Sequence, residues 1–268
     1  MSPETILFAV LTGVLLGMIG GGGSILTVPV LVYAVGITPL IATAYSLFII
    51  GTTSIFGAVR LGRQHTIDYK TAMMFGLPSV LAIFITRKYL LTCIPDPVFH
   101  LGAHAITKGG FIMSLFAILM FVSATFMILD FHPIKTQSTA TNSKAILFMI
   151  IEGLFIGLFT GLVGAGGGFL IIPSLVILRN LEMKLAVGTS LFIIAINSIV
   201  GVISNVSLLH SFDWMLVIPF TTFAVTGMFV GIELSKIISA AKLRTAFGWF
   251  TLIMGILIIL KEFYLNHL

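Results

Sequence analysis

The chain carries one glycine-rich segment twice, and this duplication limits the folds open to it. Residues 13–32 read GVLLGMIGGGGSILTVPVLV and residues 157–176 read GLFTGLVGAGGGFLIIPSLV, which align without a gap at an offset of 144 residues. The offset continues downstream, where residues 46–50 match residues 190–194 as SLFII. After one inserted residue, Asp68 pairs with Asp213. The chain is therefore predicted to be a duplicated unit with the same glycine interruption in each copy.

The composition is that of a membrane protein. Hydrophobic residues make up 58% of the chain and charged residues 9%, whereas soluble domains carry about 25% charged residues. The apolar residues form long runs separated by short polar stretches. The net charge of +5 comes from basic residues scattered between these runs, where they orient membrane spans and do not form a nucleic-acid surface. We predict an all-α polytopic, multi-pass protein of the cell inner membrane, with the lipid bilayer and no nucleic acid among its partners.

Two of the predicted apolar segments are unusual. The segments are 5–35, 42–61, 72–91, 109–130, 146–178, 186–208, 214–235 and 244–263. Most have ordinary spanning length, because about 20 residues in a helix cross a hydrocarbon core of about 30 Å. The first and fifth are too long for one comfortable span and too short for two. Glycines at their centres would break any helix there.

The distribution of basic residues indicates how these two segments run. If each crosses the membrane once, the basic residues divide almost evenly between the two sides. If each returns to the side it entered, ten basic residues share one side against four: Arg60, Arg63, Lys70, Lys135, Lys144, Arg179, Lys184, Lys236, Lys242 and Arg244. An excess of basic residues marks the cytoplasm. The two repeats then run in opposite directions, as in many secondary transporters.

The predicted organisation follows from this count. A first membrane repeat, 1–135, is joined by a linker, 136–143, to a second, 144–268. The repeats are predicted to be inverted. Each opens with a helical hairpin that is broken by glycine, either as a re-entrant hairpin or as two short spans.

The glycine breaks are the candidate binding site. A helix that restarts inside the membrane presents free N–H groups and a positive dipole end, which favour an anion. The new helices are predicted to begin near Ser24, a candidate N-cap, and near Gly168 or Phe169. Close helix packing is the alternative role for membrane glycines, and we favour it for Gly13, Gly17, Gly157 and Gly161. The predicted substrate-binding residues of the breaks are Gly20, Gly21, Gly22, Gly23, Ser24, Gly164, Gly166, Gly167 and Gly168.

Polar residues in the following spans complete the candidate site. Ser46, Ser190 and Asn197 offer neutral donors for an oxyanion, although a serine can instead bond back to its own helix. Glu152 is an acid well inside a span and is the candidate for coupling to protons. We expect no enzyme activity, no catalytic residues, no metal site and no cofactor, since the sequence contains neither HExxH nor GxxxxGK[ST].

The paired motifs GMIGGGGSILTVPVLV and GLVGAGGGFLIIPSLV, with the stretch around Pro219 to Gly231, resemble the TauE/SafE sulfite exporter family over nearly the whole chain. The 92–110 connection is longer and less basic than the family pattern. The resemblance implies a secondary transporter that exports a small sulfur-containing oxyanion, sulfite or an organosulfonate, through a site at the repeat interface. A passive anion channel of the same architecture is the alternative, and a homo-oligomer is left open.

Overall fold

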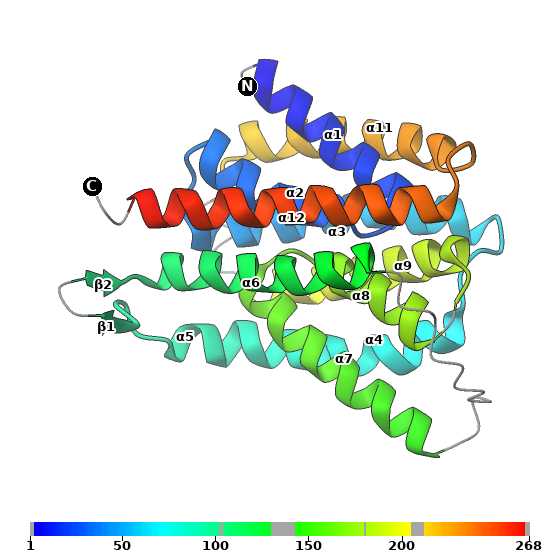
Figure 1. The fold of residues 1–268 in the computed structure, drawn as a ribbon, viewed down its shortest axis with the longest axis horizontal. Helices are drawn as coiled ribbons and strands as arrows, with labels where there is room; N and C mark the ends of the chain where they lie inside the picture. The colour runs from blue at the N-terminus through cyan, green and yellow to red at the C-terminus, as the bar shows by residue number, and fades with distance from the viewer. Residues whose placement is uncertain (1–2, 102–103, 130–142, 180, 205–211, 266–268) are drawn as a thin grey trace.

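The computed structural model describes residues 3–101, 104–129, 143–179, 181–204 and 212–265, and these are helical almost throughout (Figure 1). The elements of the first half are α1 (Pro3–Ile19), α2 (Ser24–Pro29), the π-helix η1 (Val30–Ala34), α3 (Pro39–Gly62), α4 (Tyr69–Ile85), the π-helix η2 (Thr86–Leu90), the single-turn α5 (Leu91–Cys93), strands β1 (Phe99–Leu101) and β2 (His104–Ile106), and α6 (Lys108–Ile128). Those of the second half are α7 (Ser143–Val163), α8 (Gly168–Pro173), the π-helix η3 (Ser174–Leu178), α9 (Met183–Ile203), α11 (Trp214–Leu234) and α12 (Ala240–Leu265).

The prediction of a polytopic all-α membrane protein is confirmed. Within the described residues, 7 helices are long and apolar enough to cross a bilayer. The first glycine segment forms two shorter apolar helices, Pro3–Ile19 and Ser24–Ala34. The sequence did not predict the antiparallel β1–β2 hairpin in the 92–110 connection. The predicted linker 136–143 lies, except for Ser143, outside the described residues, so the repeat boundaries stay a prediction.

Polar side chains fix where several of the long helices begin. Asp68 precedes α4, and its carboxylate accepts hydrogen bonds from the Thr71 N–H and hydroxyl at 3.2 and 2.6 Å. Asp213, its partner in the sequence duplication, accepts a hydrogen bond from the Met215 N–H at the start of α11, at 3.0 Å. Such N-caps satisfy N–H groups that have no partner within the helix. The duplication therefore extends to the residues that start corresponding helices.

Corresponding helices of the two halves pack in exchanged pairs. Helix α1 packs along α11, while α7, the counterpart of α1, packs along α4, the counterpart of α11. Helix α3 packs on its counterpart α9, and α6 on its counterpart α12. Glycine permits the first two contacts, because Gly13 lies against the Ala224 carbonyl and Gly157 against the Ser79 carbonyl. The packing role predicted for Gly13 and Gly157 is thus confirmed.

Counterpart helices run in opposite directions along the long axis. Helix α6 starts at the end of the molecule that carries the β-hairpin, whereas α12 runs toward that end (Figure 1). The second glycine segment turns back along α7, since Arg179 after η3 lies 3.7 Å from Glu152 near the middle of that helix. Inverted repeats require these features, and the inverted relation itself stays a prediction from the sequence.

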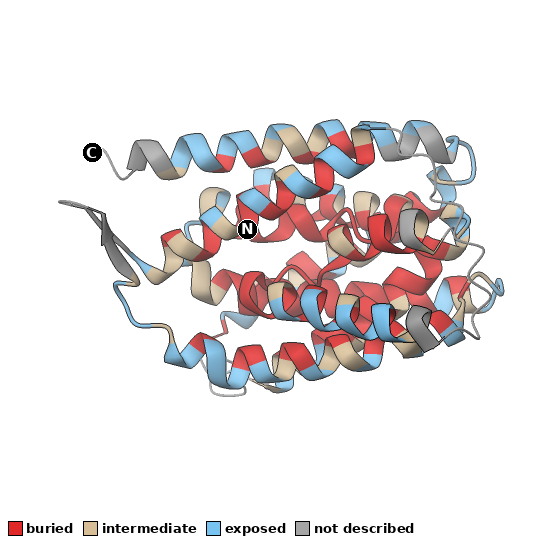
Figure 2. Cartoon of the chain, turned by 60° about the horizontal axis from the view of Figure 1, so that its bottom comes forward, coloured by how far each residue is buried: buried red, intermediate tan, exposed pale blue. Residues whose placement is uncertain are grey.

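The helices that hold the candidate site form the centre of the molecule. In the spanning windows of α3 and α9, 67% of the residues are buried, against 28% for α12 at the periphery. Figure 2 shows buried residues concentrated between the outer helices. The outer helices expose large apolar side chains such as Leu77, Phe155 and Leu260, which suits a surface facing lipid. Polar groups at the centre of this fold are therefore shielded from lipid.

Candidate functional site

Each glycine segment breaks its helix where the sequence predicts. Helix α2 begins at Ser24 and helix α8 at Gly168. The first residue of each break takes a left-handed backbone conformation, with φ +80° at Gly20 and +74° at Gly164. Glycine adopts this conformation without the steric cost that a Cβ brings. The matched φ values explain why the two copies share a glycine at this position.

Ser24 does not cap helix α2, so that prediction is wrong. The N-cap is Gly23, and no side chain accepts a hydrogen bond there. Gly23 already has helical backbone angles, φ −65° and ψ −27°, which moves Ser24 into the first turn. From there the Ser24 hydroxyl donates back to the Gly21 carbonyl oxygen at 2.6 Å. The first N–H groups of α2, at Ser24, Ile25 and Leu26, donate instead to the carbonyls of residues 21–23.

The two breaks meet backbone to backbone at the centre of the molecule. A Cβ placed on Gly21 would overlap the backbone of Gly168, and one placed on Gly168 would lie 2.5 Å from the Gly21 Cα. Each break also packs on the central helix of the other repeat: Gly20 lies against Val187 in α9, and Gly164 against the corresponding Thr43 in α3. The glycines thus allow the two interruptions to approach more closely than any larger residues would permit.

The breaks leave buried backbone donors unpaired. Among the described residues, no hydrogen bond is donated by the N–H groups at positions 21–23 or at the corresponding positions 165–167. All of these residues are buried. An unsatisfied N–H group is costly at membrane depth, where only protein, a water-filled cavity or a ligand can satisfy it. The donor sets of the two breaks therefore suit an acceptor of small size, such as an oxyanion.

Hydroxyl groups of the central helices lie beside the breaks. The Ser190 hydroxyl adjoins Gly20, 2.7 Å from where a Cβ would stand, and donates to the Val187 carbonyl at 2.9 Å. Ser198 adjoins Gly166, and its hydroxyl has no partner among the described residues. The buried Ser46 hydroxyl is also without a partner there. Ser46 and Ser198 therefore keep a free donor, whereas the donor of Ser190 is bound to its own helix.

Asn197 links two helices. Its Nδ2 donates to the Ser79 hydroxyl of α4 at 2.9 Å, and its Oδ1 has no partner within the described part of the chain. One of the two N–H donors of this amide is thus engaged between α9 and α4. Its assignment to substrate binding stays a prediction.

Glu152 lies near the middle of α7 (Ser143–Val163), about three turns before the break at Gly164. Ser174 of η3 donates a hydrogen bond to its carboxylate, and Arg179 lies 3.7 Å from the other carboxylate oxygen. The Arg179 guanidinium also faces the Phe148 ring at 6.0 Å from its centroid. These contacts hold η3 and the residue that follows it against α7. Glu152 therefore has a structural role, and its role in proton coupling stays a prediction.

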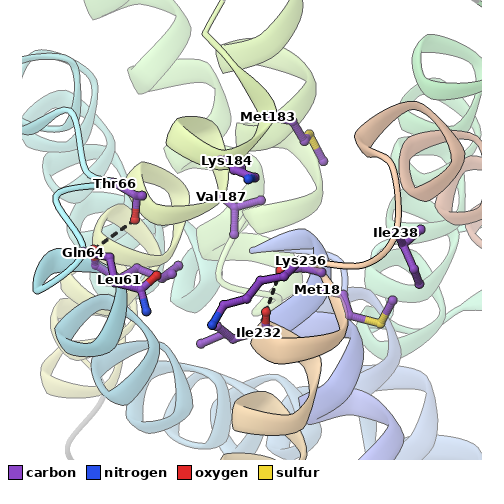
Figure 3. Close-up of a pocket in the computed structure, with 12 residues that line it drawn as sticks. Met18, Leu61, Gln64, Thr66, Met183, Lys184, Val187, Ile232, Lys236 and Ile238 are labelled. Atoms are coloured by element: carbon purple, nitrogen blue, oxygen red, sulfur yellow. Dashed lines mark hydrogen bonds between the residues drawn. The ribbon is translucent and has the colours of Figure 1, made fainter.

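A cavity of about 310 Å³ lies next to the first break, at the basic end of the molecule, where α3 and α11 end and α9 begins. Val187, which contacts Gly20, lines it together with Gly17. Nearer the loops it is lined by polar and basic residues (Figure 3): Gln64, Thr66, Lys184, Ser235 and Lys236. The sequence alone could not identify this cavity, because its walls come from segments far apart in the chain.

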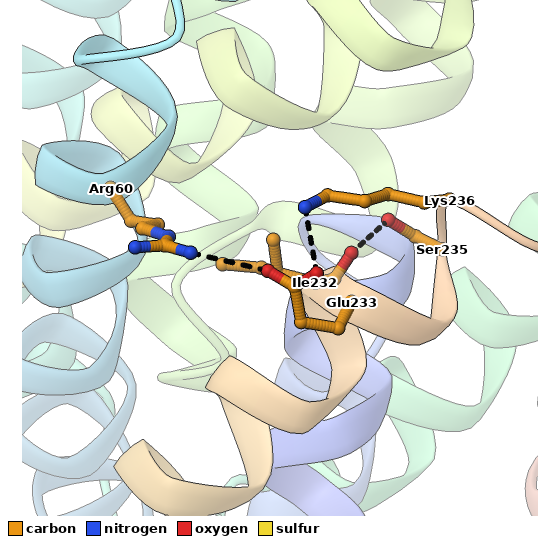
Figure 4. Close-up of polar contacts among 5 residues, drawn as sticks. All are labelled: Arg60, Ile232, Glu233, Ser235 and Lys236. Carbon is orange, nitrogen blue, oxygen red and sulfur yellow. Dashed lines mark hydrogen bonds and ion pairs between the residues drawn. The ribbon is translucent and has the colours of Figure 1, made fainter.

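The basic residues around the cavity are not equally available to an anion. Glu233 pairs with Lys236 at 2.7 Å and with Arg60 at 3.2 Å (Figure 4). No ion pair involving Lys184 occurs among the described residues. Lys184 therefore supplies positive charge to the cavity that no carboxylate offsets.

Comparison with known proteins identifies relatives over nearly the whole chain. The family described as Sulfite exporter TauE/SafE matches residues 5–258. The Bacillus subtilis (strain 168) protein named "Probable membrane transporter protein YjnA" is 29% identical over 265 residues, which cover 97% of this chain and 100% of the relative. A Xylella fastidiosa (strain 9a5c) protein named "Probable membrane transporter protein" is 26% identical over 259 residues, or 94% of this chain and 92% of the relative. No solved structure matches the chain significantly.

Proposed function

This chain belongs to the TauE/SafE sulfite exporter family of membrane transporters, and from that premise we propose that it exports a small sulfur-containing oxyanion. Sulfite or an organosulfonate would bind where the two glycine breaks meet. Transport would be secondary, driven by an ion gradient or by the gradient of the substrate, and the protein would reside in the inner membrane.

One observation carries this proposal: two helix breaks bring unpaired, buried N–H groups together in the core. Gly21 and Gly168 stand in backbone contact, and the amides at 21–23 and 165–167 have no acceptor among the described residues. Neutral amides with helix N-termini bind oxyanions in many proteins. Because no counter-charge fixes the anion there, it can be released as well as bound.

The cavity supplies a route to this site. Its basic lining raises the local concentration of anions, and Val187 connects its wall to Gly20. Gln64, Lys184 and Lys236 line the cavity where α3 and α11 end and α9 begins, which is the end predicted to be cytoplasmic. A cytoplasmic entrance that collects anions is what an exporter requires.

Flux of radiolabelled sulfite into proteoliposomes tests the proposal, with thiosulfate, sulfate and sulfoacetate as competitors. We expect saturable flux that one of these anions competes with. Gly166→Leu should abolish it, because a Cβ there would lie 3.0 Å from Ile194 and 3.2 Å from Ile50. Gly36→Leu is the matched control, since Gly36 has a similar φ of +82° and nothing within 4 Å.

The possible results are distinct. Normal flux in Gly166→Leu would refute the site at the breaks. Absence of flux for every sulfur anion, from wild-type protein shown to be folded, would refute the substrate. Accumulation against the anion's gradient when an ion gradient is imposed distinguishes a secondary transporter from a passive channel.

A further inference from the structure

Arg87 is a fully buried arginine without a partner. Its side chain is 0% exposed, and none of its three guanidinium nitrogens has a hydrogen-bond partner among the described residues. No ion pair in the described part of the chain reaches it. Ionisable residues inside the membrane are rare and mark substrate pathways when they occur. The unpaired guanidinium of Arg87 is therefore a candidate site for an anionic ligand.

Arg87 lies beside the second glycine break. It follows Thr86, whose side chain contacts Gly161 of α7. Helices α4 and α7 run in the same direction at this contact, because Gly153 meets Phe75 and Gly157 meets Ser79 further back. The break at Gly164 comes one turn after Gly161. The guanidinium is thus carried by the segment that packs against the end of α7, where that helix is interrupted.

The sequence duplication relates Arg87 to a wall of the cavity. With the offset of 145 residues that pairs Asp68 with Asp213, Arg87 corresponds to Ile232, which lines the cavity at the basic end. Lys236 of that cavity corresponds to Leu91 at the same offset, and Lys184 corresponds to Leu40 at the offset of 144 residues that holds before the inserted residue. The two halves therefore carry positive charge at positions that do not correspond to one another.

At the β-hairpin end the equivalent space is filled. Leu91, Ile112 and Leu162 are buried together, and Leu40 packs against them. Leu162 corresponds to Met18, another residue of the cavity wall. One end of the molecule thus has an open cavity with lysines. The other has a closed leucine cluster, and the unpaired Arg87 comes four residues before its member Leu91.

We propose that Arg87 binds the transported oxyanion on the β-hairpin side of the breaks, when the cluster of Leu40, Leu91 and Leu162 separates. This inference rests on the proposed function and adds a residue and a second stage to it. An anion passing from the breaks toward this side would meet a guanidinium, which holds an oxyanion through several N–H groups in one plane. Closing the leucine cluster again would leave the arginine unpaired, as observed.

Three variants test this role in sulfite, sulfate and thiosulfate flux assays. Arg87→Met should lower the flux of the anion that the wild type carries at least tenfold, and Arg87→Lys should retain part of it with a raised KM. Lys88→Met is the matched control, because Lys88 is an exposed neighbour on the same helix and should transport as the wild type does. The melting temperature of Arg87→Met should equal or exceed that of the wild type, since removing an unpaired buried charge relieves a desolvation cost.

A binding measurement provides a second readout. Millimolar amounts of the same anions, added singly to detergent-solubilised protein, should raise the melting temperature of the wild type and of Lys88→Met, because a ligand that binds only the folded state stabilises it. Arg87→Met should show no such rise or a clearly smaller one.

Three results would overturn the role of Arg87. The first is wild-type KM and flux in Arg87→Met, which would leave the proposed function intact. The second is a melting temperature of Arg87→Met below those of the wild type and Lys88→Met, which would make Arg87 a structural residue. The third is wild-type protein that shows neither flux nor a thermal shift with any of the three anions, which would refute the proposed function as well.

Discussion

Three alanine substitutions should separate backbone strain from steric overlap at the first glycine break. Gly36 has φ +82° with nothing within 4 Å of an added Cβ. Gly36→Ala should therefore lower the free energy of unfolding by about 1 kcal/mol, which is the cost of the left-handed conformation alone. Gly21 does not have positive φ, but its Cβ would overlap the Gly168 backbone. Because a backbone cannot rotate away, Gly21→Ala should cost about 1–3 kcal/mol, as overpacking does.

Gly20→Ala combines both effects. Its φ is +80°, and a Cβ would lie 2.7 Å from both the Ser190 hydroxyl and the Val187 Cα. The two costs together come to about 2–4 kcal/mol. The order of stability should therefore be wild type, then Gly36→Ala, then Gly20→Ala.

Thermal unfolding in detergent measures this order. For chains of this size, about 1 kcal/mol shifts the melting temperature by about 2–4 °C. We expect a fall of about 2–4 °C for Gly36→Ala and of roughly 5–15 °C for Gly20→Ala. If Gly20→Ala melts at the same temperature as Gly36→Ala, the close approach of the first break to α9 is wrong. If Gly21→Ala matches the wild type, the two breaks do not meet.

Further predictions address topology, entry and the second hairpin. Single cysteines at Arg63 and Lys242, in a cysteine-free background, should both react with a membrane-impermeant reagent from the cytoplasmic side; labelling from opposite sides would refute the inverted arrangement. Lys184→Gln should reduce the initial flux at low salt and have less effect at high salt, because screening weakens steering; an unchanged salt dependence would exclude Lys184 from entry. Glu152→Gln should lower the melting temperature, since it removes the carboxylate that pairs with Arg179. If this pair is structural, the variant should keep the proton dependence of flux. Loss of that dependence would establish the coupling role instead.

Much of the fold and part of the site could be predicted because the signals are local. A run of glycines breaks a helix wherever it occurs, so the starts of α2 and α8 follow from sequence. The N-cap at Ser24 was wrong because Gly23 takes helical angles itself, a choice that packing of the short helix decides. The backbone contact of Gly21 with Gly168 depends on how two distant segments meet, and no local pattern encodes it.

Arg87 illustrates the same limit. In the sequence it is one of a pair of basic residues near the end of an apolar segment, which is typical of a residue that orients a span. The helix continues through η2 to Cys93 and α7 packs against it, so the side chain becomes fully buried. Its neighbour Lys88 stays exposed. Which of two adjacent cations is buried depends on the face that tertiary packing covers.

The exchanged pairing of helices has a consequence for biosynthesis. Helix α1 leaves the ribosome long before α11 (Trp214–Leu234), yet it packs along that helix. At about 5–20 residues per second, the ribosome makes the intervening chain in roughly 10–40 s. During this time the glycine face of α1 has only lipid or an insertion factor against it. Helix α1 thus reaches its native neighbour only after most of the described chain has been made, and the first half cannot finish assembling before the second has been synthesised.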